Sequence, residues 1–209
     1  MTDVGLITGL IFLIPIGAFL IGSIPFGYLV GRFAYRTDLR KHGSGNIGAM
    51  NALRTLGTKG AVVVLLLDAA KGALPVLLVD ALGYGAGVLV CVAAACAVLG
   101  HCFSPWLGWK GGKGVATAFG AIFALCWPAG LVCVGAWLLG ALVVTRYSSV
   151  GSMLAMIVSP FALYFFTRSF YPTLFGVFLA FLVAWTHRKN IVRLRTGTEG
   201  PIRLFERKA

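Results

Sequence analysis

The sequence predicts an all-α, polytopic membrane protein with about seven transmembrane helices. Of its 209 residues, 59% are hydrophobic, and the mean hydropathy is +0.92. Charged residues make up only 11% of the chain, less than half of the ~25% that is usual in soluble domains. The third observation is that the basic residues alternate from one connection to the next. No linker or low-complexity tract divides the sequence, so we expect one membrane domain over residues 1–209.

Seven apolar runs mark the expected spans. They cover residues 4–31, 61–79, 85–103, 115–126, 129–145, 150–166 and 171–186. A helix needs about 17 to 25 apolar residues to cross a bilayer. The fourth run is shorter than this, and Trp127-Pro128 breaks the chain before the fifth. We therefore expect a short half-helix there, directly after the glycine-rich stretch "WKGGKG" at 109–114.

The basic residues predict the orientation of these spans. All lysines and arginines except Arg168 and Lys71 lie in alternate connections or in the tail after the last span. Connections rich in Lys and Arg stay in the cytoplasm. An odd number of spans preserves this alternation, so we expect the N-terminus outside and the C-terminus in the cytoplasm. The predicted location is the cell (inner) membrane, with several passes and the polar clusters facing the cytoplasm.

The first polar cluster follows the first span and reads "HGSGNIGAMNALRTLG", residues 42–57. Glycine, serine and asparagine are common loop residues, so a plain loop is the simplest interpretation. Arg54 favours a binding site instead, because its planar guanidinium matches phosphate oxygens in pairs. Arg54 also follows Asn51 by three positions, which is one helical face. The candidate residues here are Ser44, Gly45, Asn46, Gly48, Asn51 and Arg54.

The second cluster reads "GHCFSPWLGWKGGKGVAT", residues 100–117. It is not the nucleotide-binding P-loop, because Leu107 stands where that motif needs glycine and Gly114 stands where it needs Ser or Thr. A half-helix that starts inside the membrane directs the positive end of its dipole into a half-buried cavity. We therefore expect this loop to bind phosphate rather than only to cap the helix. The candidates are His101, Gly111, Gly112, Lys113 and Gly114.

The third cluster, "HRKNIVRLRTGTE" at 187–199, follows the last span. His187, Asn190 and Arg193 recur every three residues, so we expect them to share one helix face. Ser149, in another connection on the same side, adds a further polar group. Within a span, Asp68 and Lys71 are spaced to form an ion pair. Charges inside a membrane indicate a functional site, and a tether between helices is the alternative.

Metal and cofactor chemistry are not expected. The chain has six acidic residues and three histidines, which leaves no dense set of ligands. Its five cysteines contain no CxxC pair and are interpreted as small buried hydrophobes. The net charge of +12 is explained in part by topology and by anionic lipid headgroups. We expect no nucleic-acid partner and no obligate protein partner.

Together the three clusters resemble the bacterial acyl-phosphate:glycerol-3-phosphate acyltransferase family of small integral-membrane enzymes. "SGNIGAMNALR", "GH…GGKGVAT" and "HRKNIVRLRTGTE" occur in the order and spacing of that family's motifs, over nearly the whole chain. Met50 stands where the family usually has threonine, and Ser104 where it usually has proline. The resemblance implies that a fatty acyl group passes from acyl phosphate to the 1-hydroxyl of glycerol 3-phosphate. The products would be lysophosphatidic acid, a membrane lipid, and inorganic phosphate.

The resemblance also implies roles for the candidate residues. Those expected to act in catalysis are Ser44, Arg54, Lys113, His187 and Asn190. Those expected to bind substrate are Gly45, Asn46, Gly48, Asn51, His101, Gly111, Gly112, Gly114, Ser149 and Arg193. Either a histidine or the substrate's own phosphate could accept the hydroxyl proton, and the sequence leaves both open.

Two other functions are compatible with a basic, glycine-rich face. A transporter of a phosphorylated metabolite or lipid could bind its cargo there, but the polar groups gather on one side only and no internal repeat is visible. A lipid-binding scaffold would not need three glycines around one lysine. The His-x4-Asp motif of other acyltransferases is absent, since no histidine is followed five positions later by aspartate.

Overall fold

The structure is a computed structural model that describes residues 2–85 and 87–202, with only the backbone described for residues 2–11. Arg203, Arg207 and Lys208, which are among the basic residues of the predicted cytoplasmic tail, lie outside the described residues. The described chain is helical. Its α-helices are α1 (Thr2–Ser23), α2 (Phe26–Leu29), α3 (Ala49–Val79), α4 (Val88–Cys102), α5 (Val115–Leu125), α6 (Trp127–Leu138), α7 (Ser148–Thr167), α8 (Phe170–Thr186) and α9 (Arg188–Arg195). Turns of 3₁₀ or π geometry extend or connect them at Val30–Ala34, Leu39–Lys41, Asp80–Tyr84, Pro105–Leu107 and Leu139–Val144.

Each predicted apolar run corresponds to one of α1, α3, α4, α5, α6, α7 and α8, and the largest differences concern the first two runs. The first run is interrupted after Ser23, and a new helix starts at Phe26. Pro25 causes the break, because proline lacks an N–H and disfavours helical geometry in the residue before it. The second helix begins at Ala49, earlier than the apolar run at 61, and it kinks at Gly57, where φ is 79°.

Several helices are long and apolar enough to cross a membrane. Five pass by length and composition, namely Phe12–Ala34, Ala49–Tyr84, Val88–Leu107, Trp127–Val144 and Ser148–Thr167. The pair α8 and α9, bent by 57°, makes a sixth if it is counted as one span. With 11 residues, α5 is the short helix that follows the glycine loop. It is about 16 Å long, whereas the hydrocarbon core measures ~30 Å. The predicted count of seven therefore depends on including α5.

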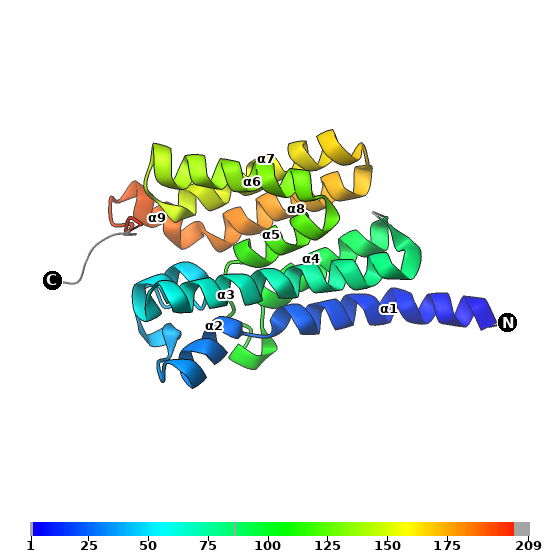
Figure 1. The fold of residues 1–209 in the computed structure, drawn as a ribbon, viewed down its shortest axis with the longest axis horizontal. Coiled ribbons are helices and arrows are strands. Elements are labelled where there is room, and N and C mark those ends of the chain that lie inside the picture. The colour runs from blue at the N-terminus through cyan, green and yellow to red at the C-terminus, as the bar shows by residue number, and fades with distance from the viewer. Residues whose placement is uncertain (1, 86, 203–209) are drawn as a thin grey trace.

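The helices pack in two groups on either side of α5 (Figure 1). On one side α3 lies against α5, and α1 lies against α4; on the other, α7 packs between α6 and α8. Glycines permit close approach between neighbouring helices. A Cβ added at Gly22, Gly72 or Gly120 would lie within 2.0 Å of a backbone oxygen of the facing helix. Small residues serve this purpose in membranes, where helices associate through packing rather than through the hydrophobic effect.

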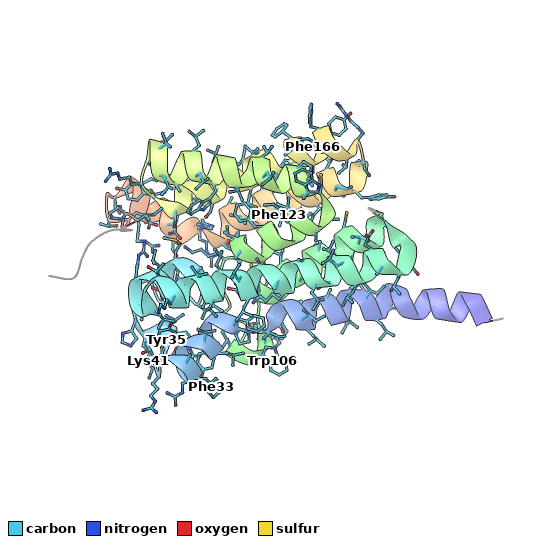
Figure 2. The ribbon with its side chains drawn as sticks, in the orientation of Figure 1. Phe33, Tyr35, Lys41, Trp106, Phe123 and Phe166 are labelled. Carbon is cyan, nitrogen blue, oxygen red and sulfur yellow. The ribbon has the colours of Figure 1, made fainter. Side chains whose placement is uncertain are left out.

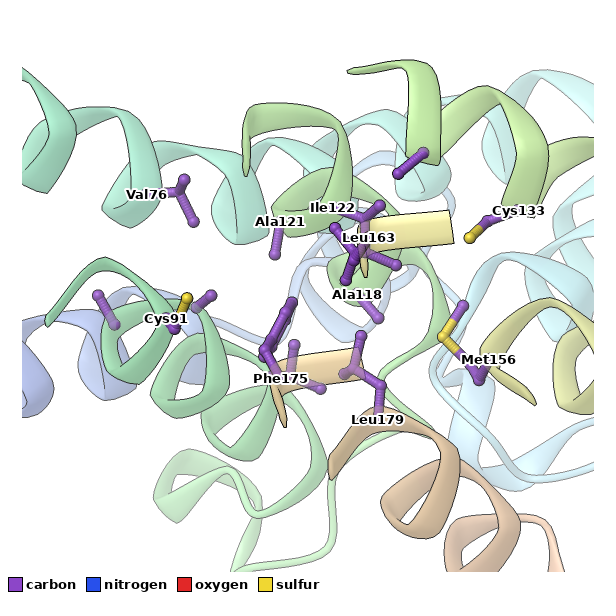
Figure 3. Packing of buried hydrophobic residues seen from close by; sticks show 14 of the residues in the cluster. Val76, Cys91, Ala118, Ala121, Ile122, Cys133, Met156, Leu163, Phe175 and Leu179 are labelled. Carbon is purple, nitrogen blue, oxygen red and sulfur yellow. The ribbon is translucent and has the colours of Figure 1, made fainter. Parts of the chain in front are cut away.

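Buried apolar side chains of α1 and of α3 to α8 form one core (Figure 3). Its fully buried side chains include Ala121 and Ile122 of α5, Met156 and Leu163 of α7, and Leu179 of α8. Large apolar side chains also cover the outside of the bundle: Phe161 is 72% exposed and Phe181 is 75% exposed. An apolar exterior around a packed apolar core is what a bilayer solvent allows.

The two ends of the bundle differ in character. α9 and the segment between α2 and α3 lie at one end, opposite the beginning of α1 (Figure 1). Phe33, Tyr35 and Lys41 project at that end, whereas Phe166 lies at the other (Figure 2). Aromatic side chains near both ends are typical of membrane interfaces. The end that carries α9 brings together segments from all three polar clusters.

Candidate functional site

The three polar clusters meet at one pocket of about 350 Å³. The first cluster contributes Ser44, Gly45 and Asn46. The second contributes Trp109, Lys110, Gly111, Gly112 and Lys113, next to Cys102 and Phe103 at the end of α4. The third contributes Thr186, Arg188, Lys189, Asn190 and Arg193, together with Trp185. Segments more than a hundred positions apart in the sequence thus form one cavity with a basic wall and an aromatic edge.

The glycine loop folds back onto the end of α4. The amide of Gly111 donates to the Cys102 carbonyl at 3.0 Å, and the amide of Gly112 donates to the His101 carbonyl at 3.0 Å. Gly114 then begins α5 with φ at 81°, in the left-handed region that favours glycine. The loop therefore needs glycine for two local reasons, close contact with α4 and positive φ.

We expect Gly112→Ala to lower the melting temperature. A Cβ at Gly112 would lie 2.1 Å from Nε2 of the buried His101 ring, so the ring or the loop must shift. Overpacking of this kind costs about 1–3 kcal/mol, which corresponds to several degrees in a chain of this size. Thermal unfolding of the purified variant measures the shift. Gly135→Ala is the matched control, because nothing lies within 4 Å of its added Cβ. Equal melting temperatures for the two variants would contradict the proposed steric cause.

Lys113 joins the glycine loop to α9. Its Nζ donates to Oδ1 of Asn190 at 2.5 Å, and its carbonyl accepts from the Thr186 hydroxyl at 3.1 Å. The pKa of Lys113 is lowered to about 8, mainly by burial; Glu199 opposes this shift and Arg193 adds to it. A bound anion would favour the charged ammonium. Lys113 is therefore a half-buried cation at the wall of the pocket.

Glu199 organises the segment that follows α9. Its Oε1 accepts from Asn190 Nδ2 at 2.6 Å and from the Ser149 hydroxyl at 3.0 Å. Its Oε2 accepts from Arg193 Nε at 2.6 Å. Partial burial opposes ionisation of Glu199, but these hydrogen bonds outweigh it and keep the pKa of Glu199 below its usual value. Ser149 thus reaches the site through Glu199.

Asn51 shapes the first loop from inside. Its Oδ1 accepts from the Ser44 amide at 2.8 Å. Its Nδ2 donates to the carbonyls of Leu39, His42 and Asn46 at 2.9, 3.1 and 2.7 Å. The side chain is 2% exposed, so its hydrogen-bonding groups face the loop backbone. We infer that Asn51 holds Ser44 and Asn46 at the pocket.

Eight predicted site residues line the pocket: Ser44, Gly45, Asn46, Gly111, Gly112, Lys113, Asn190 and Arg193. The other seven predicted residues lie outside the lining, namely Gly48, Asn51, Arg54, His101, Gly114, Ser149 and His187.

Three of these outer residues support the frame of the pocket. Exposed Arg54 donates to the Gly200 carbonyl at 3.1 Å and holds the tail. Gly48 precedes α3, and its amide donates to the Asn46 side chain at 2.8 Å. His187, 2% exposed, lies at the corner between α8 and α9 with Nδ1 2.8 Å from the Val183 carbonyl. Of the three residues expected to share one helix face, His187, Asn190 and Arg193, only Asn190 and Arg193 line the pocket.

The sequence reasoning missed two groups of residues. Glu199 was not among the candidates, although it is the only acidic residue between His187 and Gly200, in a strongly basic segment. The aromatic edge of Phe103, Trp109 and Trp185 was also missed. These residues could have been found from their positions in the sequence, because each lies at the end of a span or in a loop beside basic residues.

Together these features define a class: integral-membrane proteins with a pocket lined by basic side chains at one end of a helical bundle. The family profile described as glycerol-3-phosphate acyltransferase matches residues 12–197. The glycerol-3-phosphate acyltransferase of Rhodopseudomonas palustris (strain BisB5) is 46% identical, over 88% of this chain and 92% of the relative. That of Paramagnetospirillum magneticum (strain ATCC 700264 / AMB-1) is 48% identical, over 88% of this chain and 90% of the relative.

Solved structures agree with the sequence comparisons. The crystal structure of PlsY (YgiH), an integral membrane glycerol 3-phosphate acyltransferase, in its glycerol 3-phosphate form matches with a TM-score of 0.85 and 36% identity. The match covers 92% of this chain and 95% of that one. The lysophosphatidic acid form matches with a TM-score of 0.80 and 35% identity. The chain belongs to the glycerol-3-phosphate acyltransferase family, which confirms the resemblance seen in the motifs.

Proposed function

We propose that this enzyme transfers a fatty acyl group from acyl phosphate to the 1-hydroxyl of glycerol 3-phosphate. The products are lysophosphatidic acid and inorganic phosphate. The observation that carries this proposal is the convergence of the three motifs on one pocket with a basic wall and an aromatic edge. The glycerol 3-phosphate and lysophosphatidic acid forms of the similar PlsY structure support the same substrate and product.

The basic wall suits two phosphorylated substrates. Lys113 and Arg193 lie beside the glycine loop, and Arg188 and Lys189 line the pocket from the beginning of α9. The start of α5 adds the positive end of a helix dipole behind Lys113. The volume of about 350 Å³ lies at the lower end of the usual range for small-ligand pockets. Ser44 and Asn190 line the same pocket and can orient the reacting groups.

The reaction needs positioning and charge stabilisation more than a strong base. The 1-hydroxyl oxygen attacks the acyl carbonyl carbon and forms the ester bond, while the bond from that carbon to the phosphate oxygen breaks. Phosphate leaves with the electron pair, and the hydroxyl proton is transferred to it. We assign the proton to the phosphate because the described lining of the pocket includes no histidine, and Nδ1 of His187 faces the Val183 carbonyl. Cations fixed around both phosphates stabilise the charge that develops.

The aromatic edge offers the acyl chain an exit to the bilayer. The rings of Phe103 and Trp185 are 5.7 Å apart between centroids, and both line the pocket. The guanidinium of Arg188 lies 4.2 Å above the Trp185 ring. Trp109 also lines the pocket and is 62% exposed. An acyl phosphate could therefore place its phosphate at the basic wall and its chain along these rings.

Donor choice tests the proposed function. We expect the purified protein to form lysophosphatidic acid from glycerol 3-phosphate and acyl phosphate, because both phosphates have basic partners in the pocket. Parallel incubations with acyl phosphate and with acyl-CoA, followed by product quantification, measure the preference. Transfer from acyl-CoA alone would contradict the proposal. Absence of product with either donor would favour the transporter, which binds a phosphorylated cargo without reacting.

We further propose seven spans in the cell (inner) membrane, with the pocket in the cytoplasm. The short α5 supports this arrangement, because counting it keeps the basic connections on one side. Single cysteines in a background without native cysteines, labelled with an impermeant reagent, test the topology. Positions Lys41, Lys110 and Arg195 should react from the cytoplasm, and Asp80 and Arg168 from outside. Labelling of Lys41 and Lys110 from opposite faces would overturn the proposal.

A further inference from the structure

Three ionisable side chains lie buried in the bundle and take no part in the chemistry described above. Asp68 and Lys71 of α3 are 0% and 3% exposed, and His101 of α4 is 3% exposed. Lys71 Nζ lies 2.7 Å from Asp68 Oδ1, so the ion pair predicted from their spacing is present. His101 Nδ1 lies 3.6 Å from the same oxygen. Ionisable groups at membrane depth are costly, and those that persist usually serve a function.

The cluster connects three parts of the chain. Lys71 Nζ donates to the Ile24 carbonyl at 2.6 Å, at the break where Pro25 ends α1. Apart from the ion pair, neither oxygen of Asp68 has a hydrogen-bond partner in the described part of the chain, and nor has Nδ1 of His101. A carboxylate in this position therefore depends on Lys71 and His101 for its electrostatic compensation.

His101 links this cluster to the glycine loop. Its backbone carbonyl accepts the Gly112 amide at 3.0 Å. Its ring lies directly over the same residue, since a Cβ on Gly112 would be 2.1 Å from Nε2. Gly112 is thus held on two sides by one histidine. The next residue is Lys113, whose Nζ enters the pocket and contacts Asn190.

We propose that Asp68, Lys71 and His101 are positioning residues for the acyl-transfer reaction. The ion pair holds the Asp68 carboxylate 3.6 Å from Nδ1 of His101, the buried imidazole packs against Gly112, and Gly112 places the ammonium of Lys113 in the pocket. A displacement of about 1 Å at a substrate-binding group is enough to cost 100-fold in rate. Only the kinetic test of this inference depends on the proposed function.

Hydrogen exchange tests the structural link without any assay of activity. In Asp68→Leu/Lys71→Met, both charges are removed together, so no isolated charge remains buried. We expect amides of the loop at 108–114 to exchange at least tenfold faster than in the wild type, while α7 and α8 stay unchanged. Ser159→Ala is the matched control. It removes another fully buried polar group, whose hydroxyl bonds the Met156 and Gly176 carbonyls at 2.8 and 3.3 Å. This control should leave loop exchange at the wild-type rate.

Steady-state kinetics separates positioning from a simple tether between helices. Lys71→Met alone removes the ion-pair partner of Asp68 and should lower both the melting temperature and kcat/KM. The double variant should recover most of the melting temperature, yet its kcat/KM should remain about 100-fold below wild type. Recovery of wild-type kcat/KM together with thermal stability would mean a tether and would overturn the inference.

If the double variant cannot be purified, His101→Gln provides the same test, because it leaves the charges of Asp68 and Lys71 in place. It should raise loop exchange and lower kcat/KM in the same way. Wild-type loop exchange and kcat/KM in His101→Gln would also overturn the inference. A wild-type protein inactive with acyl phosphate would instead refute the proposed function, and the exchange experiment would still decide whether the cluster holds the loop.

Discussion

Lys113→Ala should lower kcat/KM by about 2–4 kcal/mol in transition-state stabilisation, roughly 30- to 900-fold. The substitution removes a charged group that lines the pocket and contacts Asn190 at 2.5 Å. The ammonium is half-buried, and hydrogen bonds to charged groups contribute more than neutral ones, so its loss should have a large effect. Steady-state kinetics on purified protein of verified thermal stability measures the effect. Wild-type kcat and KM in this variant would mean that the glycine loop holds no substrate.

Lys113→Arg is the matched control, because it keeps the positive charge. The pKa of Lys113 lies at about 8, lowered mainly by burial. The side chain is therefore charged below pH 8 and becomes neutral as the pH rises above it. We expect kcat/KM of the wild type to fall through this range, since that parameter reports the free enzyme. The fall should be absent in Lys113→Arg, whose guanidinium stays charged. A wild-type profile that stays flat through this range would contradict the assignment.

Glu199→Ala should cost both stability and activity, with kcat/KM falling at least 100-fold. The substitution leaves Asn190, Arg193 and Ser149 without the acceptor that they share. Hydrogen bonds to charged groups contribute about 1.5–3 kcal/mol each, and two of the three donors come from α9. Without them α9 should shift away from Lys113. Thermal unfolding and kinetics on the same preparation measure the two effects.

Glu199→Gln and Ser149→Ala should lower stability and activity less than Glu199→Ala does. The glutamine variant keeps an oxygen for Asn190 and Ser149 but loses the ion pair with Arg193, so we expect an intermediate loss. Ser149→Ala removes one hydrogen bond of 3.0 Å and should cost least. If Glu199→Ala unfolds at the wild-type temperature with normal kinetics, the carboxylate does not anchor α9.

Most of the fold could be predicted from hydropathy. A membrane helix must form its backbone hydrogen bonds within itself and cover the backbone with apolar side chains. The helices of the seven apolar runs follow from that rule. The early start of α3 could not be found in this way, since its first turns carry Asn51 and Arg54 and are too polar to be part of an apolar run. The break at Pro25 lies in apolar sequence, and hydropathy is insensitive to it.

For the site, the sequence identified the right segments, but it could not distinguish the residues that line the pocket from those that support it. Spacing places Asn51 and Arg54 on one helix face, yet one is buried under the loop and the other is exposed near the tail. Spacing within α3 predicted the pair of Asp68 and Lys71, because both partners belong to one helix. Contacts between distant segments, such as Ser149 with Glu199, depend on packing that no local pattern encodes.

The close contacts at Gly22, Gly72 and Gly120 also bear on how this sequence can change over evolution. At these positions even one methyl group would meet the backbone of a neighbouring helix, so we expect selection to reject most substitutions there. Lipid-exposed positions such as Phe161 and Phe181 have no such neighbour and can drift among apolar residues at little cost. Neutral variation should therefore accumulate on the bilayer-facing surface. Purifying selection should extend along the helix contacts, well beyond the residues that touch substrate.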